Sequence, residues 1–260
     1  MNTIFFEKTG NTMLIRQQMS TYEVLRHTDE SINLDTWRAY SGQINGVDVW
    51  RKSDIEGPIR QVGAEDFLGG FHGDERYTAL TILLDGRKVE EQEDIPLTEA
   101  GSVVIFVTSD VYFCNDTEHV AFKRYKRLEF IDRKLVVSNK WKYVGTETFD
   151  VQTFTGTGLY SVYKDRLLGY STDYDCELIN DRGSEKRREI EAVHFYGDGF
   201  MITLRTLTGK GDHYVGHVHD FAKEKRPRFK AYLLGIDRSV KQYLMEQGDE
   251  LSASFEIEIV

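Results

Sequence analysis

Proline is scarce in this 260-residue chain, which has three prolines, two cysteines and no long uninterrupted apolar run. With few prolines, most of the backbone can donate its N–H groups to a sheet. Cys114 and Cys176 are too few for a disulfide scaffold and lack the C-x-x-C spacing of zinc or redox motifs, so both are expected to be free and mostly buried thiols. No stretch approaches the roughly 20 apolar residues of a transmembrane helix, so we expect no membrane insertion.

Positive charge is also in deficit. There are 33 lysines and arginines against 43 aspartates and glutamates, a formal net charge of -10. Such a chain repels a polyphosphate backbone, so nucleic acid is not an expected partner.

The first residues, MNTIFFEKTGNTM, lack the basic and apolar regions of a signal peptide. We therefore expect a protein that is cytoplasmic, or associated with a virion after assembly.

Aromatic residues are abundant: 14 Tyr and 15 Phe help to bring the aromatic fraction to 12%. Together with persistent alternation of apolar and polar residues, this predicts an all-β chain, namely a two-sheet antiparallel sandwich, jelly-roll-like, forming one domain over residues 1–260. An irregular barrel is the alternative. At most one or two short helices are expected, one of them at residues 239–247.

Turn signals divide the chain into hairpins. Asp85-Gly86 predicts a type I′ turn after strand 80–84, and Asp132-Arg133 divides residues 119–144 into two strands. A further hairpin at 189–207 has Gly-Asp-Gly at its tip, and the segments 213–221 and 229–236 follow as a pair. Residues 90–101 are expected to form an acidic loop, and residues 252–260 a strand that closes a sheet.

The stretch HVAFKRYKRLEF, residues 119–130, predicts a strand with two different faces. One face carries His119, Lys123, Tyr125, Arg127 and Glu129, and the other carries Val120, Phe122, Leu128 and Phe130. Arg124 and Lys126 fall on the apolar side, which suggests a bulge that shifts the register. Tyr offers a flat platform for a sugar ring, while Lys and Arg donate to hydroxyls or carboxylates, so this face is a candidate glycan-binding surface. The alternative is an ordinary solvated sheet face.

The hairpin at 189–207 adds His194 and Arg205, which are expected to meet across its two strands. A histidine base, a tyrosine acid and a cation that neutralises a carboxylate make up the minimal set for β-elimination of a uronic-acid polymer. In that interpretation His119 or His194 is the base, Tyr125 the acid and Arg205 or Lys123 the neutralising cation.

Three histidines, His213, His217 and His219, lie close together in HYVGHVHD. No carboxylate or cysteine stands at a diagnostic spacing, so no transition-metal site is expected. No cofactor is expected either, although a structural calcium ion without an EF-hand remains compatible with the sequence.

The run GGFHGDE, residues 69–75, places His72, Asp74 and Glu75 among three glycines. It is not a phosphate loop, because GK[ST] is missing and a strand follows rather than a helix. Either it is a structural turn capped by Asp74, or His72 and Glu75 present an acid and a base at the rim of a groove. A hydrolase pair of Asp74 and Glu75 is disfavoured, since neighbouring strand residues point to opposite faces.

The segment AEDFLGGFHGDERYTALTILLDG, residues 64–86, resembles β-sandwich domains of phage tail and other surface-polysaccharide-binding or -degrading proteins. The resemblance implies attachment to, or processing of, a cell-surface polysaccharide, with His72, Asp74 and Glu75 as site members. The leading hypothesis is therefore a receptor-binding or adhesion module that binds glycan on a concave sheet face through His72, Asp74, Glu75, Lys123, Tyr125 and Arg127. A polysaccharide lyase and a purely structural virion or assembly protein are the alternatives, with homo-oligomer or virion contacts as further partners.

Overall fold

Almost every described residue of the computed structural model lies in or next to a strand. The structure describes residues 3–52, 55, 57–90, 94–160, 167–173, 185–187, 190–208, 215–220 and 229–260. The first strands are β1 (Ile4–Thr9), β2 (Thr12–Gln17), β3 (Ser20–Asp29), β4 (Leu34–Ile44), β5 (Val47–Arg51), β6 (Ile59–Gln61), β7 (Glu75–Leu84), β8 (Arg87–Val89), β9 (Asp94–Ala100), β10 (Val103–Tyr112) and β11 (Val120–Ile131). The remainder are β12 (Lys134–Tyr143), β13 (Phe149–Tyr160), β14 (Leu167–Thr172), β15 (Glu185–Arg187), β16 (Ala192–Gly197), β17 (Phe200–Thr208), β18 (Val215–Asp220), β19 (Phe229–Asp237), β20 (Tyr243–Met245) and β21 (Glu250–Ile259). Two 3₁₀ turns, η1 (Glu30–Ile32) and η2 (Gly70–His72), are the helical elements of the described chain.

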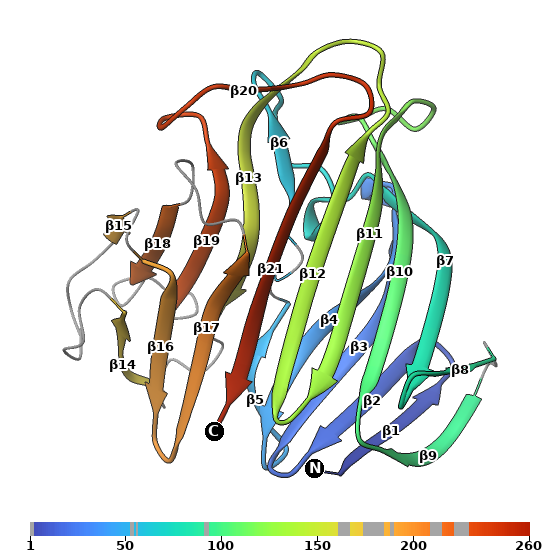
Figure 1. Ribbon diagram of the computed structural model, residues 1–260, viewed down its shortest axis with the longest axis vertical. Helices are drawn as coiled ribbons and strands as arrows, with labels where there is room; N and C mark the ends of the chain where they lie inside the picture. Colours follow the sequence, from blue (N-terminus) through green and yellow to red (C-terminus); the bar gives the residue numbers. More distant parts are fainter. Residues whose placement is uncertain are drawn as a thin grey trace.

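The larger of two sheets has the order β14-β16-β17-β21-β12-β11-β10-β7-β4-β3-β2-β1-β9, with β5 on β4 and β8 on β7. Its pairs are antiparallel except for a short parallel contact between β4 and β7. In Figure 1, β10, β11 and β12 lie in front of β3 and β4, so the sheet curls back over itself. Apolar residues from both parts, including Tyr22, Val24, Leu128 and Phe130, share one core.

The smaller sheet has the order β15-β18-β19-β13-β20, and β6 also pairs with β13. A second core lies where this sheet faces β11, β12 and β21, and it is rich in aromatic rings. Phe122 packs edge-on to Trp141 and to Phe149, with ring centroids 5.6 and 4.9 Å apart. The prediction of an all-β fold with two sheets is confirmed, and no helix in the described part of the chain has the length or apolar character to span a membrane.

The predicted turns at the ends of two hairpins are also present. Asp85 and Gly86 have φ values of 50° and 75°, which is the positive pair that a type I′ turn needs. Asp132 and Arg133 have φ values of 47° and 70° and connect β11 to β12. The hairpin of β16 and β17 closes through the opposed residues Gly197 and Phe200.

Three expectations about individual elements are wrong. Residues 239–247 form a turn followed by β20, because Ser239 N–H binds the Asp237 side chain and Met245 pairs with Phe149 of β13. Residues 94–100 form the edge strand β9 rather than a loop. The C-terminal strand β21 does not close a sheet, since it lies between β12 and β17 and bonds to both.

Candidate functional site

Strand β11 alternates between inward and outward side chains from Phe122 to Ile131. Its pairing with β12 runs in one register from Phe122 to Ile131, so the bulge expected near Arg124 and Lys126 is absent from this described stretch. The register shift that β11 does have lies between Val120 and Phe122, against β10. Lys123, Tyr125, Arg127 and Glu129 therefore point outward as predicted, whereas Arg124 and Lys126 are fully buried. Two cations inside the molecule need compensation by an anion.

Glu75 supplies that compensation. Arg124 Nη1 lies 2.6 Å from Glu75 Oε2, and Lys126 Nζ lies 3.9 Å from Glu75 Oε1. The carboxylate also accepts bonds from Thr36 Oγ1 at 3.0 Å and from the Gly70 N–H at 3.0 Å. Lys126 Nζ donates to the Trp37 carbonyl at 2.5 Å. The prediction that Glu75 lies at the rim of a groove is wrong, because its side chain is fully buried in the interior.

The electrostatics of this buried ion cluster, Glu75 with Arg124 and Lys126, favour the charged carboxylate. Burial alone raises the pKa of Glu75, but Arg124, Lys126 and the hydrogen bonds from Gly70 and Ser109 outweigh it and hold the pKa far below its usual range. A carboxylate that stays ionised and has no solvent access is not a general acid. Glu75 is a structural residue.

The GGFHGDE run is a tight turn held by backbone contacts. Gly69, Gly70 and Gly73 have φ values of 77°, 64° and 93°, and a Cβ on Gly73 would lie 2.0 Å from the Ile32 carbonyl oxygen. His72 Nδ1 lies 2.8 Å from Asp66 Oδ1 at the edge of a cavity of about 430 Å³. Asp74 lines the same cavity, and burial raises its pKa despite hydrogen bonds from Asn115 and Asn33. We call this cavity the rim pocket.

The outward face of β10, β11, β12 and β21 contains a shallow hollow of about 350 Å³. Cross-strand pairing arranges the outward residues of these strands in two rows, Thr108-Tyr125-Lys140-Ser252 and Phe106-Arg127-Ser138-Ser254, and all of them except Thr108 line the hollow. The serines are small, and Ser138 and Ser254 share a hydrogen bond at its floor. Phe106 and Tyr125 remain 38% and 44% exposed. We call this feature the outer hollow; it brings the predicted Tyr125 and Arg127 together with Phe106, which sequence reasoning missed.

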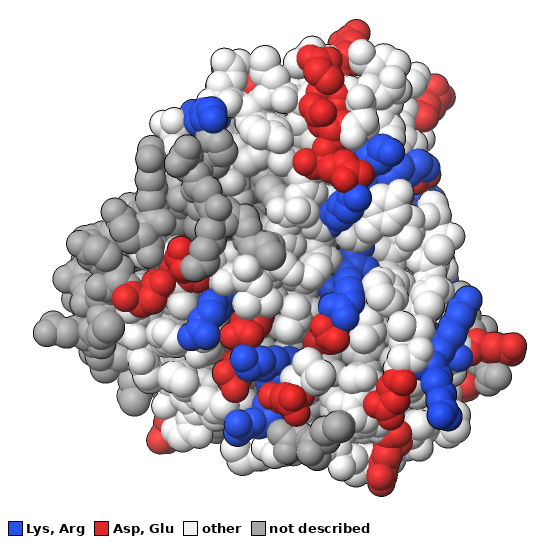
Figure 2. Space-filling view, in the orientation of Figure 1, with Lys and Arg blue, Asp and Glu red and all other residues white. Residues whose placement is uncertain are grey.

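Cations around the outer hollow are paired with carboxylates. Lys123 Nζ lies 2.5 Å from Asp110, Arg127 Nη1 lies 2.6 Å from Glu129, and Lys140 Nζ lies 2.8 Å from Glu250. Figure 2 shows basic and acidic side chains next to one another on this face, in the orientation of Figure 1.

The residues expected to act together in β-elimination do not converge. His194 lies opposite Thr203, to which its Nδ1 is bonded at 3.0 Å, and Arg205, opposite Ala192, is its diagonal neighbour across the hairpin. Burial and Arg205 lower the pKa of His194. Three strands separate β16 from β11, so His194 and Tyr125 lie roughly 19 Å apart across the sheet alone, far beyond direct proton transfer. Arg205 contacts Glu256 at 3.6 Å instead.

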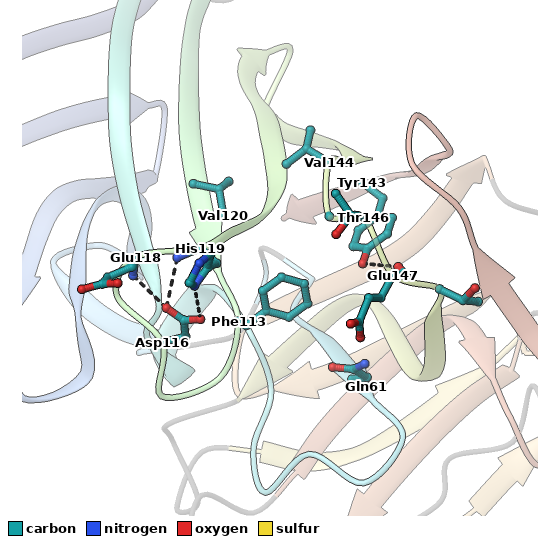
Figure 3. Close-up of a pocket in the computed structure, with 12 residues that line it drawn as sticks. Gln61, Phe113, Asp116, Glu118, His119, Val120, Tyr143, Val144, Thr146 and Glu147 are labelled. Carbon is teal, nitrogen blue, oxygen red and sulfur yellow. Dashed lines mark hydrogen bonds and ion pairs between the residues drawn. The ribbon is translucent and has the colours of Figure 1, made fainter.

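His119 lies in a different cavity, of about 630 Å³, between the β10–β11 loop and residues 143–148. In Figure 3, Asp116 is bonded to the His119 ring, and the Phe113 ring lies between this pair and Glu147. Among the described residues, its lining includes Asp116, Glu118 and Glu147 but neither Lys nor Arg. His119 directly precedes β11 and lies six positions before Tyr125, roughly 20 Å along an extended chain, so they cannot form the predicted base and acid pair.

No group of three or more His, Cys, Asp or Glu side chains in the described residues could hold a metal ion. His213 lies outside the described residues, and for His217 and His219 only the backbone of β18 is described. Cys114 is a free, partly buried thiol, and Cys176 lies outside the described residues.

Comparison with known proteins gives a similarity of fold. No protein-family model matches the sequence, and no curated protein matches it. Among solved structures, the GH36 α-galactosidase AgaB from Geobacillus stearothermophilus superposes with a TM-score of 0.56 at 8% identity, over 96% of this chain and 40% of that chain. The galactosidase domain of α-galactosidase-sucrose kinase AgaSK superposes with a TM-score of 0.54 at 10% identity, over 96% of this chain and 40% of that chain. The GH36 α-galactosidase AgaA from G. stearothermophilus, with the substitutions A355E and D478A and in complex with stachyose, superposes with a TM-score of 0.53 at 9% identity, over 99% of this chain and 40% of that chain. This chain thus spans about two fifths of the length of each match.

Proposed function

We propose that this chain binds a glycan in the outer hollow. The observation that carries the proposal is the pair of exposed rings, Phe106 and Tyr125, beside a hollow lined by serine hydroxyls. Aromatic rings stack on the apolar faces of sugars, and hydroxyls, carboxylates and cations bond their hydroxyl groups. The two rows span three strand spacings, roughly 14 Å, which suits an extended oligosaccharide rather than a single small molecule.

Binding is favoured over bond cleavage by the placement of the candidate residues. A lyase needs its base, acid and neutralising cation around one sugar, whereas His119, His194 and Tyr125 occupy three separate places. The matched α-galactosidases, one of them solved with stachyose, support a carbohydrate ligand through fold alone. The resemblance of residues 64–86 to phage-tail domains suggests that this binding serves receptor recognition, and that role stays a prediction.

Alanine substitution in the outer hollow tests the proposal. Screening the protein on an array of neutral and acidic glycans, with raffinose and stachyose included, identifies the ligand, and calorimetry then gives its affinity. Tyr125→Ala and Phe106→Ala should each weaken binding at least about tenfold, or about 1.4 kcal/mol. The matched control is Phe5→Ala, because Phe5 of β1 is 37% exposed and lies outside the outer hollow.

The control should bind as the unmodified protein does, and all three variants should keep its melting temperature because exposed rings fill little core volume. Unchanged affinity in both hollow variants would contradict the proposal. So would the absence of any bound glycan across the array.

A further inference from the structure

We infer that Asp110, Glu129 and Glu250 are specificity-determining residues that restrict the outer hollow to neutral glycans and exclude uronic acids. The inference rests on the proposed function and names the substrate class of the same site. It departs from the expectation, drawn from Lys123 and Arg127 in the sequence, that this face neutralises sugar carboxylates.

Each of these carboxylates holds one cation of the outer hollow or its border. Asp110 lies directly across from Lys123 in the β10–β11 ladder, and their side chains are 2.5 Å apart. Glu129 is two positions beyond Arg127 on the same strand face, at 2.6 Å. Glu250 reaches Lys140 of the neighbouring strand at 2.8 Å. The side chains of Asp110 and Glu129 are less exposed than those of the cations they pair with. Neighbouring atoms therefore restrict their movement, and the two negative charges keep their positions near the surface.

A uronate bound here would bring another carboxylate next to carboxylates that are already present. To bond Arg127 or Lys140 it must share the cation with Glu129 or Glu250, and the repulsion between like charges opposes this. The formal net charge of -10 adds long-range repulsion of a polyuronate. Because Arg127 and Lys140 are already paired with carboxylates, they do not form a site that binds a further anion.

A neutral sugar can form hydrogen bonds to the same ion pairs without charge repulsion. Its hydroxyls can donate to Glu129 or Glu250 and accept from Arg127 or Lys140, so both members of an ion pair are used. The pairing also limits the rotation of long side chains before binding, which reduces the entropy lost on association. Among the described cations of this face, Lys142 has no ion pair within 4.0 Å, but it does not line the outer hollow.

The test removes the carboxylates and measures whether uronate binding appears. Calorimetry at low ionic strength compares a neutral galactotetraose with tetragalacturonate, two probes of equal length, on the unmodified protein and on the triple variant Asp110→Asn, Glu129→Gln, Glu250→Gln. The unmodified protein should favour the neutral probe at least about tenfold. The triple variant should gain at least about tenfold affinity for tetragalacturonate.

A matched control separates this local effect from the change in total charge. The triple control Glu7→Gln, Asp35→Asn, Asp48→Asn removes the same number of charges, from pairs with Arg16, Arg26 and Arg51 on strands outside the outer hollow, and should leave tetragalacturonate binding nearly unchanged. Equal affinity of the unmodified protein for both probes would overturn the inference, as would a triple variant that keeps the neutral ligand without gaining the acidic one. If neither protein binds either probe, the inference is overturned, whereas the proposed function fails only if the array shows no bound glycan at all.

Discussion

Glu75 illustrates how the role of one residue depends on partners far away in sequence. In the sequence it ends a polar, glycine-rich turn and resembles a rim residue, but in the fold it neutralises Arg124 and Lys126 in the interior. The signal that could have revealed this is the position of those two cations on the apolar face of residues 119–130. A break in alternation suggests a bulge, but buried charges that require an anion explain it equally well.

Replacing Glu75 should therefore destabilise the protein strongly. Glu75→Gln keeps the side-chain size but leaves two buried cations without their anion, and we expect a loss of about 3–5 kcal/mol in the free energy of unfolding at pH 7. Urea denaturation provides the measurement. Glu250→Gln, which breaks an exposed pair, should cost less than about 1 kcal/mol and serves as the control.

The same cluster predicts a pH dependence. The folded pKa of Glu75 is depressed below its ordinary value of 4.5, so its contribution to stability is complete above that pH and is lost progressively as the pH falls below it. The difference in unfolding free energy between the unmodified protein and Glu75→Gln should accordingly shrink on acidification from pH 5 to pH 3. A constant difference over that range would show that Glu75 does not act through its charge.

At the scale of elements, the turn before β7 is positioned by glycine contacts rather than by side chains. Gly73 has a φ of 93°, and a Cβ at this position would lie 2.0 Å from the Ile32 carbonyl oxygen. The same oxygen accepts a hydrogen bond from the Asp74 N–H at 2.8 Å. Gly69 likewise has no room for a Cβ, because Trp141 lies 2.8 Å from that position. These contacts place Glu75 at the start of β7, where it reaches the buried cations.

Gly73→Ala should disrupt this turn, and Gly63→Ala is the matched control. Gly63 has a similar φ of 81° but no atom within 4 Å of the position that a Cβ would take, so its substitution should cost only about 1 kcal/mol of backbone strain. Gly73→Ala should cost at least about 2 kcal/mol more, because the Ile32 backbone must move. Thermal melting distinguishes the two, and equal losses of stability would contradict the steric explanation.

Several strands from residue 80 onward and their local turns could be predicted from the sequence, because alternation and dipeptides such as Asp85-Gly86 act over a few residues. The strands β1 to β6 and β13 were not predicted. Partners distant in sequence could not be predicted either. Nothing local to residues 250–259 indicates that β21 lies between β12 and β17, and nothing near Phe106 indicates that it shares a hollow with Ser254. Likewise, tertiary pairing with β13 overrides the helix-like pattern of residues 239–247.

For the molecule as a whole, the curled sheet (Figure 1) packs apolar side chains inside, and the side seen in Figure 2 carries basic and acidic side chains close to one another. The outer hollow, the rim pocket and the cavity at His119 share none of the lining residues that the structure describes. The residues proposed from the sequence are thus distributed over separate places, and the outer hollow combines exposed aromatic rings with hydroxyls and paired charges. The central claim is that a glycan occupies this place.

The most direct measurement is the position of a bound glycan, determined by crystallography of the complex with the ligand that the array identifies. Our account predicts a sugar ring stacked on Tyr125 or Phe106, with its hydroxyls bonded to Ser138, Ser254 or the Arg127–Glu129 pair. A glycan seated instead in the rim pocket at His72 and Asp74, or beside His119 and Glu147, with the outer hollow empty, would contradict it.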